Sequence, residues 1–237
     1  MNRIRLFCLP FAGGSKYSYR DLQAHAPDFI EFVVLEYPGR GARISENLKD
    51  DLQILVDDVL SQIICKLGEQ PYAIYGHSMG GLIAYLVVRE LVAKGYPYPQ
   101  HLFLSGIGGP SAAFREDKKR HLLDRGALIE EIKGFQGSGK DFFESEELIN
   151  YYEPILRADF TASENYSHET SIRLPIQVTV VTGTEEDLTK EEISAWDKES
   201  AFNVAYKRLP GGHFFIFKYA HEMVQMFSRV LHERVLV

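Results

Sequence analysis

The sequence predicts one α/β domain in which helices cover both faces of a mostly parallel β-sheet. Short runs rich in β-branched and aromatic residues alternate with segments of helical periodicity along most of the chain. Most of these runs are apolar nearly throughout, as expected for strands that are buried on both faces. A length of 237 residues, 45% of them hydrophobic, is enough for one large domain with a sizeable core.

The expected strands and helices alternate in the order that a parallel sheet requires. The candidate strands are Ile4–Leu9, Phe32–Glu36, Tyr72–Gly76, His101–Ser105, Ile176–Thr182 and Val204–Leu209. The clearest candidate helices are Leu48–Leu67, Met79–Ala93 and Glu222–Val235. The last helix carries apolar residues at helical spacing, which we interpret as the face that packs on the core.

The segment from about residue 111 to residue 173 interrupts this alternation. It has no strand pattern, but it contains several helical patches and falls between the fourth and fifth strands. We interpret it as a helical lid inserted over the carboxyl edge of the sheet, within a single domain spanning residues 1–237. A disordered insert is the alternative, and the aromatic and apolar content of the segment favours a folded lid.

Composition and charge restrict the function classes. The formal net charge is -7, so nucleic acid and anionic membranes are poor candidates as partners. No apolar run approaches the length of a membrane span, and the N-terminus lacks a signal peptide, so we expect a cytoplasmic protein. Cys8 and Cys65 lie in apolar surroundings and are expected to be a reduced, buried pair.

The strongest local signal is Gly76-His77-Ser78-Met79-Gly80, which matches the pattern G-x-S-x-G. It follows an expected strand and precedes an apolar helix, which is the context of a nucleophile on a sharp strand-to-helix turn. Side chains at positions 76 and 80 would collide with neighbouring backbone in such a turn. The sequence therefore predicts that Ser78 is a nucleophile.

A nucleophilic serine needs a histidine base and an acid that orients the base. In this fold the chain order is serine, acid, histidine. His213 directly follows the last expected strand, and two glycines before it permit a tight loop. Three carboxylates follow the preceding strand, of which we choose Asp187 as the acid because it lies deepest in the turn. Glu185 and Glu186 remain alternatives.

Two backbone N–H groups are needed to stabilise the oxyanion that forms during attack on a carbonyl. The residue after the nucleophile, Met79, is expected to supply one. The loop after the first strand, residues 10–14, contains two glycines and is expected to bring the second donor from Ala12 or Phe11.

At this point the chain resembles one family over nearly its whole length. That family is the stand-alone type II thioesterases of non-ribosomal peptide and polyketide synthases, which have the α/β-hydrolase fold. The matching segments are Leu9-Pro10-Phe11-Ala12-Gly13-Gly14, Tyr37-Pro38-Gly39-Arg40-Gly41-Ala42-Arg43, Gly76-His77-Ser78-Met79-Gly80-Gly81, Pro154-Ile155-Leu156-Arg157-Ala158-Asp159, Trp196 and Gly211-Gly212-His213-Phe214-Phe215.

The resemblance implies a substrate and a set of site residues. Family members hydrolyse acyl, aminoacyl or short peptidyl groups from the phosphopantetheine arm of a carrier protein, and thereby clear mis-primed or stalled synthases. Carried over to this sequence, Ser78, Asp187 and His213 fall on the family's triad. Ala12 and Met79 fall on its oxyanion donors.

Several charged positions also match the family pattern. Arg157 and Asp159 match a lid motif to which we assign a structural role. Arg40 and Arg43 match family positions, either as carrier contacts or as solvated loop arginines. The basic run Lys118-Lys119-Arg120 is a candidate contact for an acidic carrier protein, with a merely solvated helical face as the alternative.

Two other functions share parts of this pattern. A medium-chain acyl-carrier-protein hydrolase of fatty acid synthesis, or a general carboxylesterase, has every catalytic element in common. A non-catalytic hydrolase-fold binding protein is the alternative from another class, and its expected mark is a missing triad member. The sequence shows no metal-ligand cluster, P-loop, haem or flavin signal, so no cofactor is expected.

Overall fold

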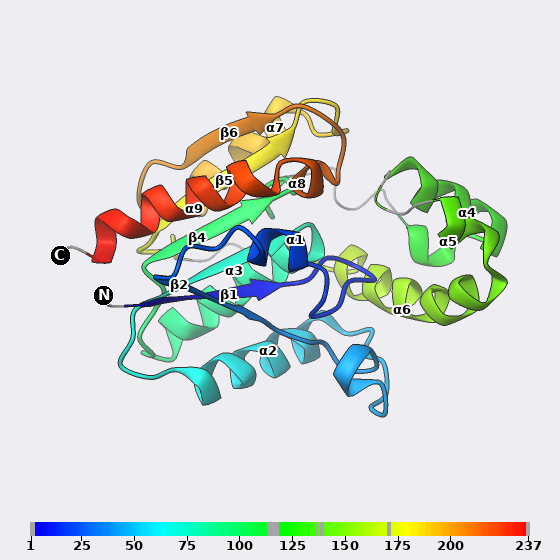
Figure 1. Ribbon diagram of the computed structural model, residues 1–237, viewed down its shortest axis with the longest axis horizontal. Coiled ribbons are helices and arrows are strands. Elements are labelled where there is room, and N and C mark those ends of the chain that lie inside the picture. The colour runs from blue at the N-terminus through cyan, green and yellow to red at the C-terminus, as the bar shows by residue number, and fades with distance from the viewer. Residues whose placement is uncertain (1–2, 113–118, 136, 138–139, 170–171, 236–237) are drawn as a thin grey trace.

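The computed structural model describes residues 3–112, 119–135, 137, 140–169 and 172–235. At its centre is a six-stranded sheet in the order β2-β1-β3-β4-β5-β6, with every neighbouring pair parallel (Figure 1). The strands are β1 Ile4–Leu9, β2 Ile30–Val34, β3 Tyr72–His77, β4 His101–Ser105, β5 Gln177–Gly183 and β6 Ala205–Leu209. The predicted parallel sheet is therefore confirmed.

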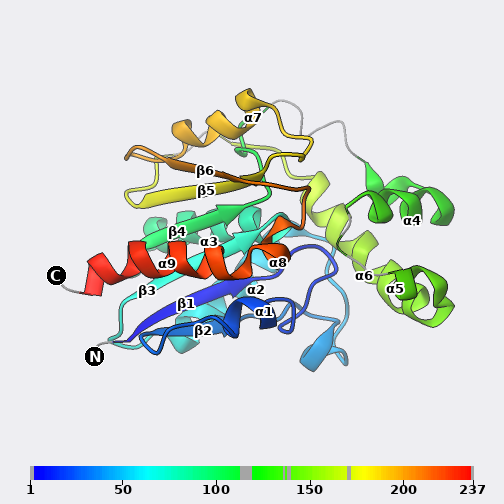
Figure 2. The same cartoon turned by 45° about the horizontal axis from the view of Figure 1, so that its top comes forward.

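Helices cover both faces of the sheet (Figure 2). On one face lie α2 (Leu52–Lys66) and α3 (Met79–Ala93). On the other lie α1 (Arg20–Gln23), α8 (Phe215–Lys218) and α9 (Ala220–Val235). The short helix α7 (Lys190–Ser194) precedes β6, and single 3-10 turns occur at Gly41–Arg43, Arg120–Leu122 and Ala195–Lys198.

Alternating side chains of each strand enter two different hydrophobic cores. In β1, Phe7 and Leu9 pack with the side chains of α2 and α3, whereas Leu6 and Cys8 pack with those of α9. All four side chains are fully buried. Because successive side chains of a strand point to opposite faces, a strand covered on both faces must be apolar throughout. This two-sided burial explains the uninterrupted apolar runs in the sequence.

Several local expectations need correction. Strand β2 spans Ile30–Val34 and not Phe32–Glu36, and α9 begins at Ala220 and not at Glu222. Helix α2 begins at Leu52 and not at Leu48, because the carboxylate of Asp51 accepts a hydrogen bond from Ile54 N at 3.0 Å and caps the helix there. The expected buried cysteine pair is also wrong. Cys8 is buried but Cys65 is exposed on α2, and both are free thiols.

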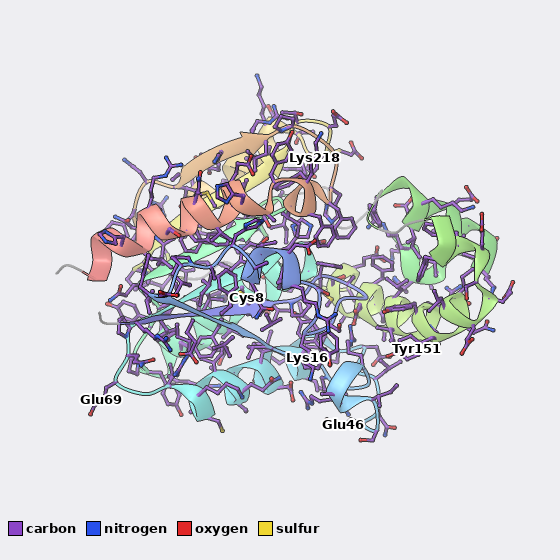
Figure 3. All side chains as sticks on the ribbon, in the orientation of Figure 1. Cys8, Lys16, Glu46, Glu69, Tyr151 and Lys218 are labelled. Carbon is purple, nitrogen blue, oxygen red and sulfur yellow. The ribbon has the colours of Figure 1, made fainter. Side chains whose placement is uncertain are left out.

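Between β4 and β5 the described residues form three helices that lie beyond the carboxyl ends of the strands (Figure 1). We call α4 (Arg125–Gly134), α5 (Lys140–Glu144) and α6 (Glu146–Glu164) the lid helices. In Figure 3 Tyr151 marks this end of the molecule, and Glu69 marks the opposite end. In the part of the chain that the structure describes, no helix combines the length and apolarity needed to cross a bilayer.

Candidate active site

The register of the sheet brings the loops that carry the predicted site residues to one edge. Leu9 of β1 pairs with Gly76 of β3, so the loop after β1 lies beside the turn that holds Ser78. Gly183 of β5 pairs with Leu209 of β6, so the loops after these two strands also lie side by side. The strand order reverses between β1 and β3, and in open α/β sheets such a point is where ligands bind.

Ser78 occupies a strained turn between β3 and α3. Its φ of 54° makes it the one non-glycine residue with positive φ among the described residues. Its backbone N–H donates to Ser105 O at 2.8 Å, and its carbonyl accepts from Gly81 N at 2.8 Å. Strain of this kind is retained where the surrounding structure enforces it, and it is concentrated at functional sites.

The glycines around the turn permit backbone contacts that a side chain would prevent. A Cβ atom on Gly76 would lie 2.2 Å from Gly80 O, and one on Gly80 would lie 2.2 Å from Leu9 O. Both distances are far shorter than any real carbon–oxygen contact. The predicted steric reason for these glycines is therefore confirmed, and the contact with Leu9 O packs the start of α3 against the end of β1.

His213 lies in the loop after β6, and its Nδ1 is 2.7 Å from Glu186 Oε1. The second carboxylate oxygen, Oε2, accepts a hydrogen bond from Gly183 N at 2.6 Å. The side chain of Glu186 is only 3% exposed. A carboxylate held at both oxygens fixes the orientation of the imidazole ring, as the acid of a catalytic triad does.

This pairing corrects the predicted acid, Asp187. The loop after β5 folds back on the loop after β6 through hydrogen bonds from Thr184 N to Leu209 O and from Glu185 N to Gly211 O. The next residue, Glu186, consequently points into the fold, whereas Asp187 is an exposed residue on the rim of the cavity. Depth within the turn was the wrong criterion. The useful signal was the position three residues beyond the glycine that ends the strand.

A second histidine lies directly behind His213. His77 is fully buried, and its Nδ1 is 2.8 Å from Ser105 Oγ. Its Nε2 has no hydrogen-bond partner in the described part of the chain. Its ring centroid is 4.7 Å from that of His213. Burial lowers the pKa of His77 well below its ordinary value, and the neighbouring charge of His213 lowers it further. His77 is therefore a neutral ring that packs against His213 from the buried side.

The predicted oxyanion donors flank Ser78. Met79 is the first residue of α3 and is buried, so its N–H belongs to the helix turn that has no internal acceptors. Ala12 lies in the loop after β1, on the side of the sheet toward the lid helices, where Lys16 of the same loop is labelled in Figure 3. Within the described residues no hydrogen-bond acceptor is recorded for Ala12 N–H.

One cavity of about 1020 Å³ contains the predicted nucleophile, base and oxyanion donors together. Ser78, Met79, Ala12 and His213 all line it, as does Glu186. The lid segment contributes the apolar and aromatic side chains of Ile132, Phe135, Phe142, Leu148, Tyr152, Leu156 and Phe160 to the lining, together with the polar Glu131, Ser163 and Glu164. The ring of Phe135 lies 5.3 Å from that of His213, so the lid reaches the base itself. Such a chamber suits an apolar or aromatic acyl group.

The other charged residues singled out by the sequence form ion pairs. Arg43 is paired with both Glu46 and Asp58, at 2.7 Å each. Arg40, for which the sequence left a carrier contact or a solvated position open, is instead buried at 1% exposure and paired with Asp159. Neither arginine is a freely solvated side chain.

Within the lid, Arg157 donates to the carbonyls of His121 and Leu123, in agreement with a structural role. Arg120 is paired with Glu131 at 2.7 Å and Glu164 at 3.1 Å, so its charge is neutralised inside the lid. Lys119 is exposed, and Lys118 lies outside the described residues. Of the predicted basic run, Lys119 is thus an exposed charge and Arg120 belongs to the lid's own ion pairs. Among the described residues, no group of three or more histidine, cysteine, aspartate or glutamate side chains could hold a metal ion.

The chain is similar in sequence to known thioesterases and biosynthesis proteins. The chain is 29% identical to the gramicidin S biosynthesis protein GrsT of Aneurinibacillus migulanus over 97% of this chain and 89% of that protein. It is 31% identical to the medium-chain S-acyl fatty acid synthase thioesterase of Homo sapiens, over 92% of this chain and 83% of that one. A probable cadicidin biosynthesis thioesterase of Streptomyces griseus is 33% identical over 97% of this chain, which spans 63% of that relative's length.

Solved structures show the same fold. ClbQ, from the colibactin NRPS/PKS pathway, superimposes with a TM-score of 0.92 at 29% identity, covering 100% of both chains. BorB, a type II thioesterase from the borrelidin biosynthetic cluster, gives a TM-score of 0.87 at 26% identity over 96% of this chain and 92% of that one. The predicted α/β-hydrolase fold is confirmed. The thioesterase domain family model matches residues 4–232, and the chain therefore belongs to the thioesterase family, within the type II thioesterases of NRPS/PKS pathways that it resembles in sequence and structure.

Proposed function

We propose that this protein releases acyl or aminoacyl groups from the phosphopantetheine arm of carrier proteins, and so clears mis-primed or stalled synthases. The observation that carries the proposal is the single cavity in which Ser78 and the His213–Glu186 pair meet an apolar wall from the lid helices. The relatives named for gramicidin S and cadicidin biosynthesis, and the structural neighbour from the colibactin pathway, support this class of substrate.

The chemistry follows from the arrangement of the site. His213 takes the proton of Ser78 Oγ as this oxygen forms a bond to the thioester carbonyl carbon. The N–H groups of Ala12 and Met79 stabilise the resulting oxyanion. The carbon–sulfur bond then breaks, and the pantetheine sulfur leaves as a thiol with the proton from His213. Water, deprotonated by His213, attacks the acyl-serine carbonyl, and His213 returns the proton to Ser78 Oγ as the ester bond breaks and the carboxylic acid is released. Glu186 stays ionised and stabilises the imidazolium.

The lid belongs to the same proposal. The described part of residues 111–173 is helical, and its inner surface forms one wall of the cavity, so we propose that α4, α5 and α6 enclose the acyl group within a single-domain enzyme. Excluding water from the cavity strengthens the electrostatic stabilisation of the oxyanion. The acidic carrier protein and a cytoplasmic location remain proposals from the sequence.

A second candidate is hydrolysis of medium-chain fatty acyl groups on an acyl carrier protein. The identity to the human medium-chain thioesterase and the apolar side chains that line the cavity favour it. A panel of acyl groups loaded on carrier protein, from acetyl to decanoyl and including aminoacyl groups, separates the two functions. We expect kcat/KM to be highest for short acyl and aminoacyl groups. A steady rise toward decanoyl would favour the fatty acyl function, and p-nitrophenyl esters cleaved faster than any thioester would contradict both.

A further inference from the structure

Asp159 of lid helix α6 and Arg40 of the loop after β2 form a buried bidentate ion pair. Arg40 Nη2 lies 2.6 Å from Asp159 Oδ1, and Arg40 Nη1 lies 2.5 Å from Asp159 Oδ2. The side chains are 2% and 0% exposed. Replacing a buried ion pair by apolar residues is often neutral or stabilising, so stability alone is a weak reason for this one.

Asp159 also binds the backbone of the loop after β1. Gly13 N donates to Asp159 Oδ2 at 2.7 Å, and this is the oxygen that accepts from Arg40 Nη1. Gly13 has a φ of 76°, in the left-handed region, and directly follows Ala12, the proposed oxyanion donor. A charged acceptor gives a stronger hydrogen bond than a neutral one. Asp159 therefore fixes the peptide adjacent to the one whose N–H must point at the oxyanion.

The remaining contacts of this loop come from the core of the domain. Tyr19 Oη donates to Leu9 O at 2.8 Å, and Tyr37 Oη donates to Pro10 O at 3.0 Å. The guanidinium of Arg40 lies over the ring of Tyr37, 5.3 Å from its centroid. These bonds anchor the start of the loop. Gly13, near the middle of the loop, is held by Asp159 of the lid, and the later part of the loop is held by Glu36, whose Oε1 accepts a hydrogen bond from Lys16 N at 3.0 Å.

Side-chain packing also connects α6 with the loop after β1. A Cβ atom on Gly13 would lie 2.8 Å from Leu156 Cδ2, so α6 sits directly on this peptide. Ala12 packs against the lid cluster of Leu128, Leu156 and Phe160. The position of α6 and the direction of Ala12 N–H are therefore mechanically linked.

We propose that Asp159, held by Arg40, is a positioning residue that aligns the oxyanion loop and couples it to the position of lid helix α6. This inference rests on the proposed function, because it concerns the hydrolytic reaction of Ser78. Helix α6 therefore contacts both the cavity that holds the acyl group and the loop that carries the oxyanion donor. A displaced α6 withdraws the support of Gly13 and, with it, the alignment of Ala12.

The first test is Asp159→Asn, which keeps the shape of the side chain but removes the charge that both Arg40 and Gly13 bind. We expect kcat on an acyl-carrier thioester to fall about 100-fold, with KM changed less than about threefold, because the misaligned donor acts mainly in the transition state. Affinity for a trifluoromethyl ketone, whose serine adduct places an oxyanion in the same site, should fall in parallel. Unchanged kcat would overturn the proposal.

The matched control is Glu153→Gln. Glu153 lies on the same helix and pairs with Arg157 and Arg125 at 2.8 Å each. Among the described residues it has no hydrogen bond to the loop after β1 and does not line the cavity. We expect its kcat to remain within about twofold of the wild type, because these half-buried ion pairs lie away from the cavity and from the oxyanion loop. A fall equal to that of Asp159→Asn would show that any charge loss in α6 has this effect, and would overturn the proposal.

The double variant Arg40→Met/Asp159→Leu separates alignment from stability. It removes both charges, so no unpaired charge stays buried, and the melting temperature should approach the wild-type value. We expect kcat to stay low, because Gly13 N has still lost its acceptor. Full recovery of kcat in this variant would overturn the positioning role, even if Asp159→Asn fails to fold.

Failure of the proposed function looks different. A wild-type enzyme that hydrolyses no carrier-bound thioester would contradict the function and not the alignment. The rate of Ser78 labelling by a fluorophosphonate, which also forms an oxyanion, would then measure the alignment in the same variants. A labelling rate for Asp159→Asn equal to that of the wild type would overturn it.

Discussion

His213 and Glu186 lie four and three residues beyond two directly paired strand positions, Leu209 and Gly183, and their side chains meet at 2.7 Å. The pairing of β5 with β6 therefore brings the backbone of the two loops that carry the base and the acid close together. The additional bond from Gly183 N to Glu186 Oε2 ties the acid back to the end of its own strand. The backbone hydrogen bonds of Thr184 and Glu185 to the loop after β6 then decide which of the three consecutive carboxylates points at His213.

Replacing Glu186 should be far more harmful than replacing Asp187. Glu186→Gln keeps the size of the side chain but presents an amide to His213 Nδ1, so we expect kcat to fall about 10⁴-fold, as when a triad acid becomes an amide. Asp187→Asn, on the exposed rim, should change kcat less than about threefold. Steady-state thioester hydrolysis measures both, and the reverse ranking would restore Asp187 as the acid.

Removing the proposed nucleophile should abolish turnover without unfolding the protein. For Ser78→Ala we expect kcat to fall by about five to six orders of magnitude, the effect measured for the serine of other triads. The melting temperature should be equal to or above that of the wild type, because the substitution removes no hydrogen bond of the Ser78 side chain to the described residues. A variant that retains a tenth of the activity would end the assignment of Ser78.

A side chain at position 80 should destabilise the fold. In Gly80→Ala the new Cβ would lie 2.2 Å from Leu9 O, which is backbone and can move only with β1. We expect the free energy of unfolding to fall by about 3 kcal/mol, the upper end for overpacking. Gly68→Ala is the control, since no atom lies within 4 Å of its Cβ position. Urea unfolding compares the two, and equal stabilities would contradict the close approach seen in the structure.

Stability should fall in mild acid because of His77. Its pKa is well below the ordinary value in the folded state, so the unfolded chain binds a proton first as the pH drops below about 6.5. The folded state therefore keeps its full stability above this pH and loses about 1 kcal/mol by pH 5.5 through this residue. His77→Asn should lose that part of the pH dependence. Urea unfolding at pH 7.5, 6.5 and 5.5 measures it, and parallel curves for both proteins would contradict the prediction.

Much of the fold could be predicted because its signals are local. The strands β1 and β4 and the helix α3 begin and end at the predicted residues, since their apolar runs stop abruptly at glycine, proline or polar residues. The start of α2 could not be placed as well, because the apolar Leu48 precedes the true cap at Asp51 at a spacing that also fits a helix. For the lid the sequence predicted helices but not their bounds or their packing, since periodic apolar patches do not define how helices pack.

The sequence by itself determined the turn of Ser78, the loop of His213 and the alternation of strands and helices along the chain, because glycine spacing and apolar runs act through backbone sterics and burial over a few residues. Only the tertiary structure decided that Glu186 meets His213 and that Arg40 is buried against Asp159. These contacts join segments 27 and 119 residues apart. Each of these side chains finds its partner because the fold brings distant loops and helices together, and a local sequence pattern does not predict this.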